Sequence, residues 1–181
     1  MVPMRLFLYG KRAAGKSTVA RFLAEMGARV YKLSDPLYRI AEELFGMKEK
    51  DRRLLQLLGD KLREIDRDCL LRYLSFRLYR DEPGFAVVED VRLVREAEYL
   101  RRIGFLGVLV KAPEALRQAR LKNRGEGALP EAESHPTEAE VGLITPDFVV
   151  ENSGSLKELR KNVAAVVAEA VYRGAVPAGR R

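Results

Sequence analysis

The chain has 181 residues, 47% of them hydrophobic, and a formal net charge of +7 at pH 7. This length and composition predict one globular domain, residues 1–181, that is long enough to bury a core. No apolar run approaches the roughly 18 residues needed to cross a membrane. The sequence has neither a lysine-rich tail nor a basic run interleaved with aromatic residues, so we do not expect nucleic acid as a partner. A basic chain of this kind favours small phosphorylated ligands.

Cys69 is the only cysteine in the sequence, which excludes an internal disulfide and is typical of a reducing compartment. The short apolar stretch at residues 1–9 leads directly into a glycine-rich loop, so we expect a strand there rather than a signal peptide. We therefore expect a cytoplasmic protein. Both a monomer and a homodimer are compatible with the sequence.

Short apolar segments alternate with stretches of helical periodicity along the whole chain. The expected strands are residues 5–9, 29–33, 85–88, 105–111 and 147–151. The expected helices are at about residues 16–26, 34–45, 48–80 with a break near Gly59-Asp60, 93–103, 113–123 and 155–172. This alternation predicts an α/β protein with a five-stranded parallel sheet and helices on both faces. In such sheets, ligands bind at the carboxyl ends of the strands.

The first strand runs into a segment, GKRAAGKS at residues 10–17, that fits the pattern G-x-x-x-x-G-K-[ST] in full. Such a loop directs successive backbone N–H groups at phosphate oxygens, and the following helix adds its positive end. Lys16 would reach the β- and γ-phosphates, and Ser17 would offer its hydroxyl to Mg²⁺. We therefore expect ATP and Mg²⁺ as cofactors. The expected donor site consists of Gly10, Lys11, Ala13, Ala14, Gly15, Lys16, Ser17 and Thr18.

Arginines in the helical region that follows the second strand are candidates for holding an acceptor phosphate. Arg39 and Arg63 carry the planar guanidinium that grips a phosphate with two hydrogen bonds. Asp35 lies at the start of the same region and is also a candidate acceptor contact. Surface solvation explains the two arginines equally well, and capping of its own helix explains Asp35.

Two adjacent carboxylates, Glu89 and Asp90, follow the third strand. A carboxylate there, across from the phosphate loop, is placed for a Mg²⁺-bound water or for the acceptor. We expect Asp90 in both the catalytic and the substrate set, although the sequence does not decide which of the two acids faces the site. Arg92 would lie near the transferring group, and an ion pair within the loop is the alternative.

Arg117, Arg120 and Arg124 have spacings that place them on one face of a helix leading into a segment rich in Gly, Pro and Glu. In a lid at about residues 117–136, Arg120 and Arg124 would close on the triphosphate and neutralise charge that develops during transfer. A solvated basic face explains the same spacing. His135 is a weaker candidate for a general base, because helix capping by Ser134 or Thr137 also explains its segment.

The chain resembles the deoxynucleoside monophosphate kinases of phages and their bacterial relatives, and it is also similar to the animal-type phosphomevalonate kinases. The resemblance rests on the segments GKRAAGKST, KLSDPLYRIAEELFG, LLQLLGDKLREID, VVEDVRLVREAEYLRRIG, SHPTEAEV and DFVVENSGSLKEL. Two features depart from the phage-type pattern. Asp68-Cys69-Leu70 stands where a tryptophan usually follows the Arg63 region, and Asp90-Val91-Arg92-Leu93-Val94-Arg95-Glu96 stands where members often have D-V-R-F-P-N-E.

The resemblance implies a P-loop NTPase core, a helical substrate-binding insertion at about residues 35–80 and a lid at about 117–136. It implies that Asn152 lies near the donor base, and that the acceptor is faced by Asp35, Arg39, Arg63, Asp90 and Arg92. We therefore expect an ATP-dependent kinase of a (deoxy)nucleoside monophosphate. Phosphomevalonate and dephospho-coenzyme A are alternative acceptors. A nucleotide-binding regulatory module is the alternative of another class.

Overall fold

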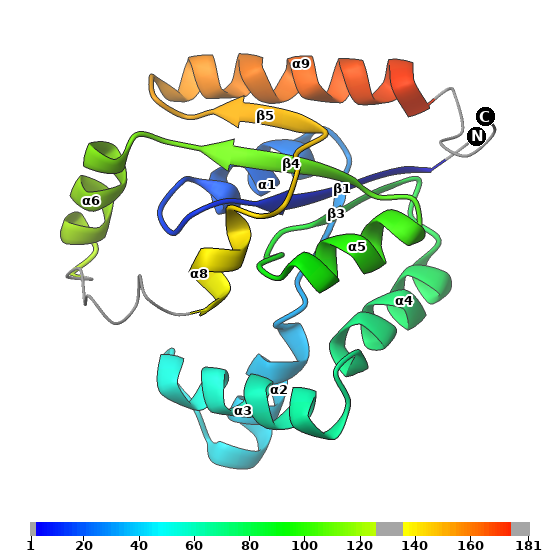
Figure 1. Cartoon of the computed structure of the whole chain (residues 1–181), viewed down its shortest axis with the longest axis vertical. Coiled ribbons are helices and arrows are strands. Elements are labelled where there is room, and N and C mark those ends of the chain that lie inside the picture. The colour runs from blue at the N-terminus through cyan, green and yellow to red at the C-terminus, as the bar shows by residue number, and fades with distance from the viewer. Residues whose placement is uncertain (1–2, 126–135, 175–181) are drawn as a thin grey trace. The chain divides into compact units, whose positions relative to one another are not determined.

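The computed structural model describes residues 3–125 and 136–174. The chain divides into two compact units, which we call the sheet unit, Met1–Val30 with Pro83–Arg181, and the helical unit, Tyr31–Glu82. Figure 1 shows the elements of both. Among the described residues, no helix is at once long enough and apolar enough to cross a bilayer.

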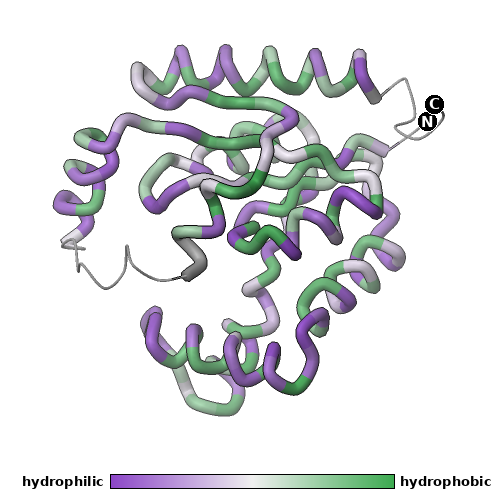
Figure 2. The backbone as a smooth tube through the Cα atoms, in the orientation of Figure 1, coloured by the Kyte–Doolittle hydropathy of each residue, from purple (hydrophilic) through white to green (hydrophobic). Residues whose placement is uncertain are grey.

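A five-stranded sheet organises the sheet unit, with the strand order β2-β3-β1-β4-β5. The strands are β1 Met4–Tyr9, β2 Arg29–Tyr31, β3 Phe85–Val88, β4 Leu106–Lys111 and β5 Phe148–Glu151. The ladders β1–β3, β1–β4 and β4–β5 are parallel, with Leu6 paired to Val87 and to Leu106. This confirms the predicted P-loop NTPase sheet. The strands are short apolar runs (green in Figure 2) because both faces of the sheet are covered.

The helices α1 Lys16–Glu25 and α9 Leu156–Gly174 cover one face of the sheet (Figure 1). Phe22 and Leu23 of α1 and Leu159 and Val163 of α9 are buried in one cluster with Leu8 of β1. These residues recur at helical spacing, so each helix presents one apolar stripe to the strands. Burial of this cluster holds the start of α1 at the carboxyl end of β1.

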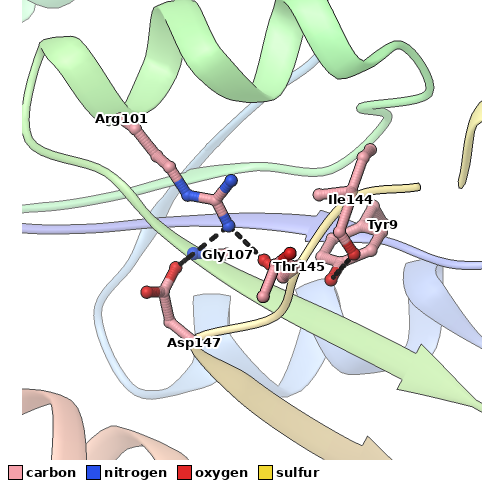
Figure 3. A network of polar contacts seen from close by, with 6 residues as sticks. All are labelled: Tyr9, Arg101, Gly107, Ile144, Thr145 and Asp147. Carbon is pink, nitrogen blue, oxygen red and sulfur yellow. Dashed lines mark hydrogen bonds and ion pairs between the residues drawn. The ribbon is translucent and has the colours of Figure 1, made fainter. Parts of the chain in front are cut away.

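The other face of β1 is closed by α5 Val94–Arg102 and by the chain between α8 Pro136–Val141 and β5 (Figure 3). The Tyr9 hydroxyl donates to the Ile144 carbonyl at 3.0 Å. Burial raises the pKa of Tyr9 to about 12, so the phenol keeps the proton that it donates. Asp147 accepts from the Gly107 N–H at 2.6 Å and lies 3.5 Å from the Arg101 guanidinium, which also bonds to the Thr145 carbonyl. This network fixes how the chain enters β5.

The helical unit consists of α2 Asp35–Phe45, α3 Arg52–Ile65 and α4 Cys69–Asp81. The predicted break near Gly59-Asp60 is wrong, because α3 runs through both residues. Gly59 is buried, and a Cβ there would come within 3.4 Å of a Leu37 methyl group, so the missing side chain lets α2 and α3 approach closely. The helix ends instead at Ile65, and the carboxylate of the C-cap residue Asp66 accepts from the Asp68 N–H at 3.0 Å in an Asx turn.

We expect Gly107→Ala to destabilise the fold by about 1–3 kcal/mol, because overpacking forces a buried ring to move. A Cβ at Gly107 would lie 2.6 Å from Cζ of Phe7, a ring with no exposed surface. Gly84→Ala is the matched control, since its Cβ would meet nothing within 4 Å. Thermal melts compare the two variants. Equal melting temperatures would contradict the close packing of β1 against β4.

Candidate functional site: the phosphate loop

The loop between β1 and α1 adopts a backbone that two glycines make possible. Gly10 has φ +148°, and a Cβ there would lie 2.2 Å from the Val110 carbonyl oxygen. Gly15 has φ +105°, and a Cβ there would lie 2.2 Å from Nδ2 of Asn152. Ala13 is also left-handed, with φ +60°, a conformation that non-glycine residues adopt at a cost and mainly at functional sites. The sequence pattern therefore corresponds to a curled loop with neighbours pressed against its back.

Helix α1 begins at Lys16, immediately after the loop, and the Gly15 that precedes it has no side chain to cap the first turn. The orphan N–H groups of this turn are the donors that an anion can use, and the helix dipole favours negative charge at the same place. The Lys16 ammonium folds back over the loop and donates to the carbonyls of Gly10 at 2.6 Å and Lys11 at 3.1 Å. The positive charge of Lys16 and the N–H donors of the first turn of α1 thus occur together at the phosphate loop.

Ser17 pairs with Glu89, the first residue after β3. The Ser17 hydroxyl donates to Oε1 of Glu89 at 2.8 Å, and the Glu89 residue is only 9% exposed. The structure therefore places the first of the two adjacent acids against the loop. The sequence had favoured Asp90, which is half-buried and not in this contact. Successive side chains of a strand point to opposite faces, but this rule stops where the strand ends. The sequence alone therefore did not show which of Glu89 and Asp90 points toward the loop.

A hydroxyl and a carboxylate side by side fit the oxygen ligands that Mg²⁺ prefers. Within residues 3–125 and 136–174, no group of three or more His, Cys, Asp or Glu side chains could hold a metal ion. A divalent ion at Ser17 and Glu89 would therefore take its other ligands from phosphate oxygens and water. That incomplete protein shell is typical of Mg²⁺ in phosphate sites and unlike a dedicated metal cage.

Helix α6, Glu114–Asn123, supplies contacts to the back of the loop. Arg117 donates to the Arg12 carbonyl at 3.2 Å and Arg120 to the Ala13 carbonyl at 3.1 Å. Asn152, just after β5, donates through Nδ2 to the Ala14 carbonyl at 2.8 Å. The solvated arginine face that the spacing allowed is therefore wrong for Arg117, which is 6% exposed, whereas Arg124 beyond the helix end is exposed. Arg117 is buried because α6 packs against the loop there, whereas Arg124 lies beyond the end of the helix.

The remaining residues of the predicted donor site lie on the loop and in the first turn of α1. Ala14 is buried and Lys11 is exposed. The Thr18 N–H donates to the Gly15 carbonyl at 3.1 Å, which tightens the turn where the helix begins. The predicted roles of His135 and Ser134 lie outside the described residues, as does half of the predicted lid, residues 126–135.

The predicted acceptor residues of the helical unit are held by partners that sequence reasoning missed. Asp35 accepts from Arg77 at 2.8 Å, although Ser34, not Asp35, is the N-cap residue. Arg39, one turn further along α2, donates to the Tyr73 hydroxyl at 2.5 Å and lies over its ring. The matching four-residue spacings of the two pairs are a signal that could have revealed them.

Two predicted acceptor arginines are accessible. Arg63 on α3 has a side chain that is 32% exposed and lies 3.8 Å from Asp60, one turn earlier on the same helix. Arg92 is exposed in the sheet unit, and its backbone N–H donates to the buried Glu96 carboxylate at 2.9 Å. Each side chain therefore has surface that a ligand can reach.

Comparison with known proteins places the sequence in a family. Residues 6–138 match a family described as an AAA domain. A UPF0200 protein of Staphylothermus marinus is 25% identical over 191 residues, which cover 95% of this chain and 97% of that protein. The structure of TT1252 from Thermus thermophilus is similar with a TM-score of 0.66 and 26% identity, covering 93% of this chain and 98% of that one.

A dephospho-CoA kinase from Campylobacter jejuni shares the fold, with a TM-score of 0.55 and 16% identity over 94% of this chain and 98% of that one. At this identity the likeness concerns the fold alone. Together with the loop geometry, the family match identifies a P-loop domain that binds a nucleotide.

We expect Mg²⁺ to raise the affinity for ATP on the order of tenfold in the wild type, and Glu89→Ala to remove most of this increase, because the carboxylate beside Ser17 is lost. Asp90→Ala, the neighbouring acid, should retain it. Titrations of a fluorescent ATP analogue with and without Mg²⁺ measure both variants. The reverse result would assign the metal-side carboxylate to Asp90.

Proposed function

Because the chain belongs to the AAA domain family and has a P-loop fold like that of small-molecule kinases, we propose that it transfers the γ-phosphate of ATP to a small phosphorylated acceptor. The acceptor that we infer first is a nucleoside or deoxynucleoside monophosphate. The observation that carries the proposal is the contact of Ser17 with Glu89 at 2.8 Å beside the loop that Lys16 covers. It supports a site for a metal-bound triphosphate.

The donor half of the reaction follows from the loop. Its N–H groups and the first turn of α1 would hold the phosphates, and the Lys16 ammonium would move from the Gly10 carbonyl to the β- and γ-phosphate oxygens. A Mg²⁺ ion beside Ser17 and Glu89 would neutralise charge on the β- and γ-phosphates. Charge neutralisation and positioning supply most of the catalysis in phosphoryl transfer, which needs little covalent participation from the protein.

The acceptor half rests on arginine chemistry. The proposed acceptor ligands are Arg39, Arg63 and Arg92, with Asp35 and Asp90 as carboxylate contacts. An oxygen of the acceptor phosphate would form a bond to the γ-phosphorus while the bond to the β–γ bridging oxygen breaks and ADP leaves. Exposed Arg124, at the end of α6, is the proposed catalytic arginine of the lid.

A coupled assay of ADP release tests the proposal with a panel of acceptors. The panel contains the ribo- and deoxyribonucleoside monophosphates, dephospho-coenzyme A and phosphomevalonate. Release that depends on one or more monophosphates supports the first acceptor class, and release with only one of the other two compounds replaces that class. Slow ADP release that no acceptor accelerates would contradict the kinase proposal and favour a regulatory nucleotide-binding module.

We expect Lys16→Ala to lower kcat on the order of a thousandfold, because the β- and γ-phosphates lose their main side-chain cation. Lys157→Ala removes the same charge from the exposed surface of α9 and serves as the control. Steady-state kinetics and a thermal melt are measured for both. A folded Lys16 variant with most of its kcat would contradict the assignment of the donor site.

We expect Arg63→Ala to raise KM for the acceptor roughly ten- to a hundredfold and to leave ATP affinity nearly unchanged, since a bidentate contact to the acceptor phosphate is lost. Arg53→Ala, at an exposed position of the same helix, is the matched control. Separate titrations of the two substrates distinguish the effects. An equal loss of ATP affinity would move Arg63 to the donor side.

A further inference from the structure

Three consecutive carbonyl groups of the phosphate loop are occupied by donors that come from outside the loop. The Arg12 carbonyl accepts from Arg117, the Ala13 carbonyl from Arg120, and the Ala14 carbonyl from Asn152. Arg120 also lies 3.4 Å from the Ala14 carbonyl oxygen, which therefore has two donors. These contacts join residues more than a hundred positions apart, so they belong to the tertiary structure rather than to the loop motif.

Because the peptide group is planar, these contacts to the carbonyls also determine where the loop N–H groups point. In a trans peptide the C=O and the following N–H point in opposite directions. Holding the carbonyls of residues 12 and 14 at the back therefore directs the N–H groups of residues 13 and 15 the other way, whereas the Ala14 N–H donates to the Lys11 carbonyl at 3.1 Å. Ala13 lies between these peptides in the left-handed conformation, which recurs in loops whose N–H groups bind an anion.

The orientation of the Asn152 amide follows from Arg120. The Arg120 guanidinium donates to Oδ1 of Asn152 at 3.4 Å and to its backbone carbonyl at 3.3 Å. Because arginine has no acceptor, the amide oxygen must face it, and the amide N–H₂ is left to face the Ala14 carbonyl. The Asn152 backbone is in turn held by a 2.7 Å bond from its N–H to the Lys111 carbonyl. Arg120 and Asn152 thus act on one peptide from a rigid support.

We propose that Arg120 and Asn152, assisted by Arg117, form a clamp that orients the Ala14–Gly15 peptide so that its N–H faces the polyphosphate before the nucleotide arrives. This inference rests on the proposed donor function of the loop and deepens it. Arg120 is then a positioning residue, rather than a catalytic group that reaches the γ-phosphate, and Asn152 supports the loop rather than the donor base.

Burial gives the clamp its strength. Asn152 and Arg117 are each 6% exposed, so their hydrogen bonds form where water competes little. The Asn152 amide also lies against Gly15, where a Cβ would come within 2.2 Å of Nδ2. Gly15 is therefore required both by its φ of +105° and by the clamp that packs against it.

The first experiment needs no ligand. Hydrogen exchange is measured at the Ala14 and Thr18 amides, which donate to the Lys11 and Gly15 carbonyls, in the wild type, Arg120→Ala, Asn152→Ala and the double variant. Because loss of a clamp contact lets the loop open and breaks these bonds, the clamp predicts exchange at least about tenfold faster in each single variant, with unchanged exchange in β1 and β4. Unchanged exchange in the loop would overturn the clamp, whatever the protein binds. If Asn152→Ala does not fold, Asn152→Asp keeps the shape and sets an oxygen against the Ala14 carbonyl.

The second experiment uses inorganic tripolyphosphate, which has no base, beside ATP. The clamp predicts that each single variant weakens both ligands by a similar factor, on the order of tenfold, and that the double variant is less than additive. Lys122→Ala removes a charge from an exposed position of the same helix and should change neither affinity by more than about twofold.

Other results separate the clamp from direct contacts. If Asn152→Ala weakens ATP but not tripolyphosphate, Asn152 contacts the base and the clamp is overturned. A lower kcat for Arg120→Ala at unchanged affinity for both ligands makes Arg120 catalytic and also overturns it. Failure of the wild type to bind either ligand would contradict the proposed donor function alone, because the exchange measurement still decides the clamp.

Discussion

A peptide group of the phosphate loop that points its N–H at an anion points its carbonyl the opposite way, and that carbonyl needs a hydrogen-bond donor of its own. The apex of the loop meets this constraint with donors from distant parts of the chain, Arg117 and Arg120 of α6 and Asn152 after β5. The parallel sheet is what brings them there, because the carboxyl ends of β1, β4 and β5 lie along one edge. The rest of the sheet unit can be understood as the support of this arrangement.

The same edge provides the charge that a triphosphate and its cation require. The Lys16 ammonium donates to the Gly10 carbonyl at 2.6 Å, from which it would move to the oxygens of a bound triphosphate. Glu89 follows β3, the neighbour of β1, and its carboxylate is buried against the Ser17 hydroxyl. A divalent cation bound beside Ser17 would add a favourable interaction with this buried carboxylate.

Contacts between side chains hold the three helices of the helical unit together. The Asp35–Arg77 ion pair and the stacked Arg39–Tyr73 pair join α2 to α4 at two levels one helical turn apart. Gly59 lets α2 and α3 come close, and the Asx turn at Asp66 ends α3 where the chain must reverse. The contacts hold Asp35 and Arg39, two candidate ligands of the acceptor, within the helical unit, whereas the Arg63 side chain stays partly exposed. An acceptor would thus meet arginines that are already ordered.

The strands and the phosphate loop with its glycines could be predicted from the sequence, because alternation, periodicity and a tight turn are local properties. The choice of Glu89 over Asp90 as the partner of Ser17, and the contacts of Arg120 with the loop, came from the folded chain. Those outcomes depend on side-chain direction at strand ends and on contacts such as Asn152 to Ala14, which spans 138 positions. A single sequence contains no local signal for such a pair, because the sheet creates its proximity.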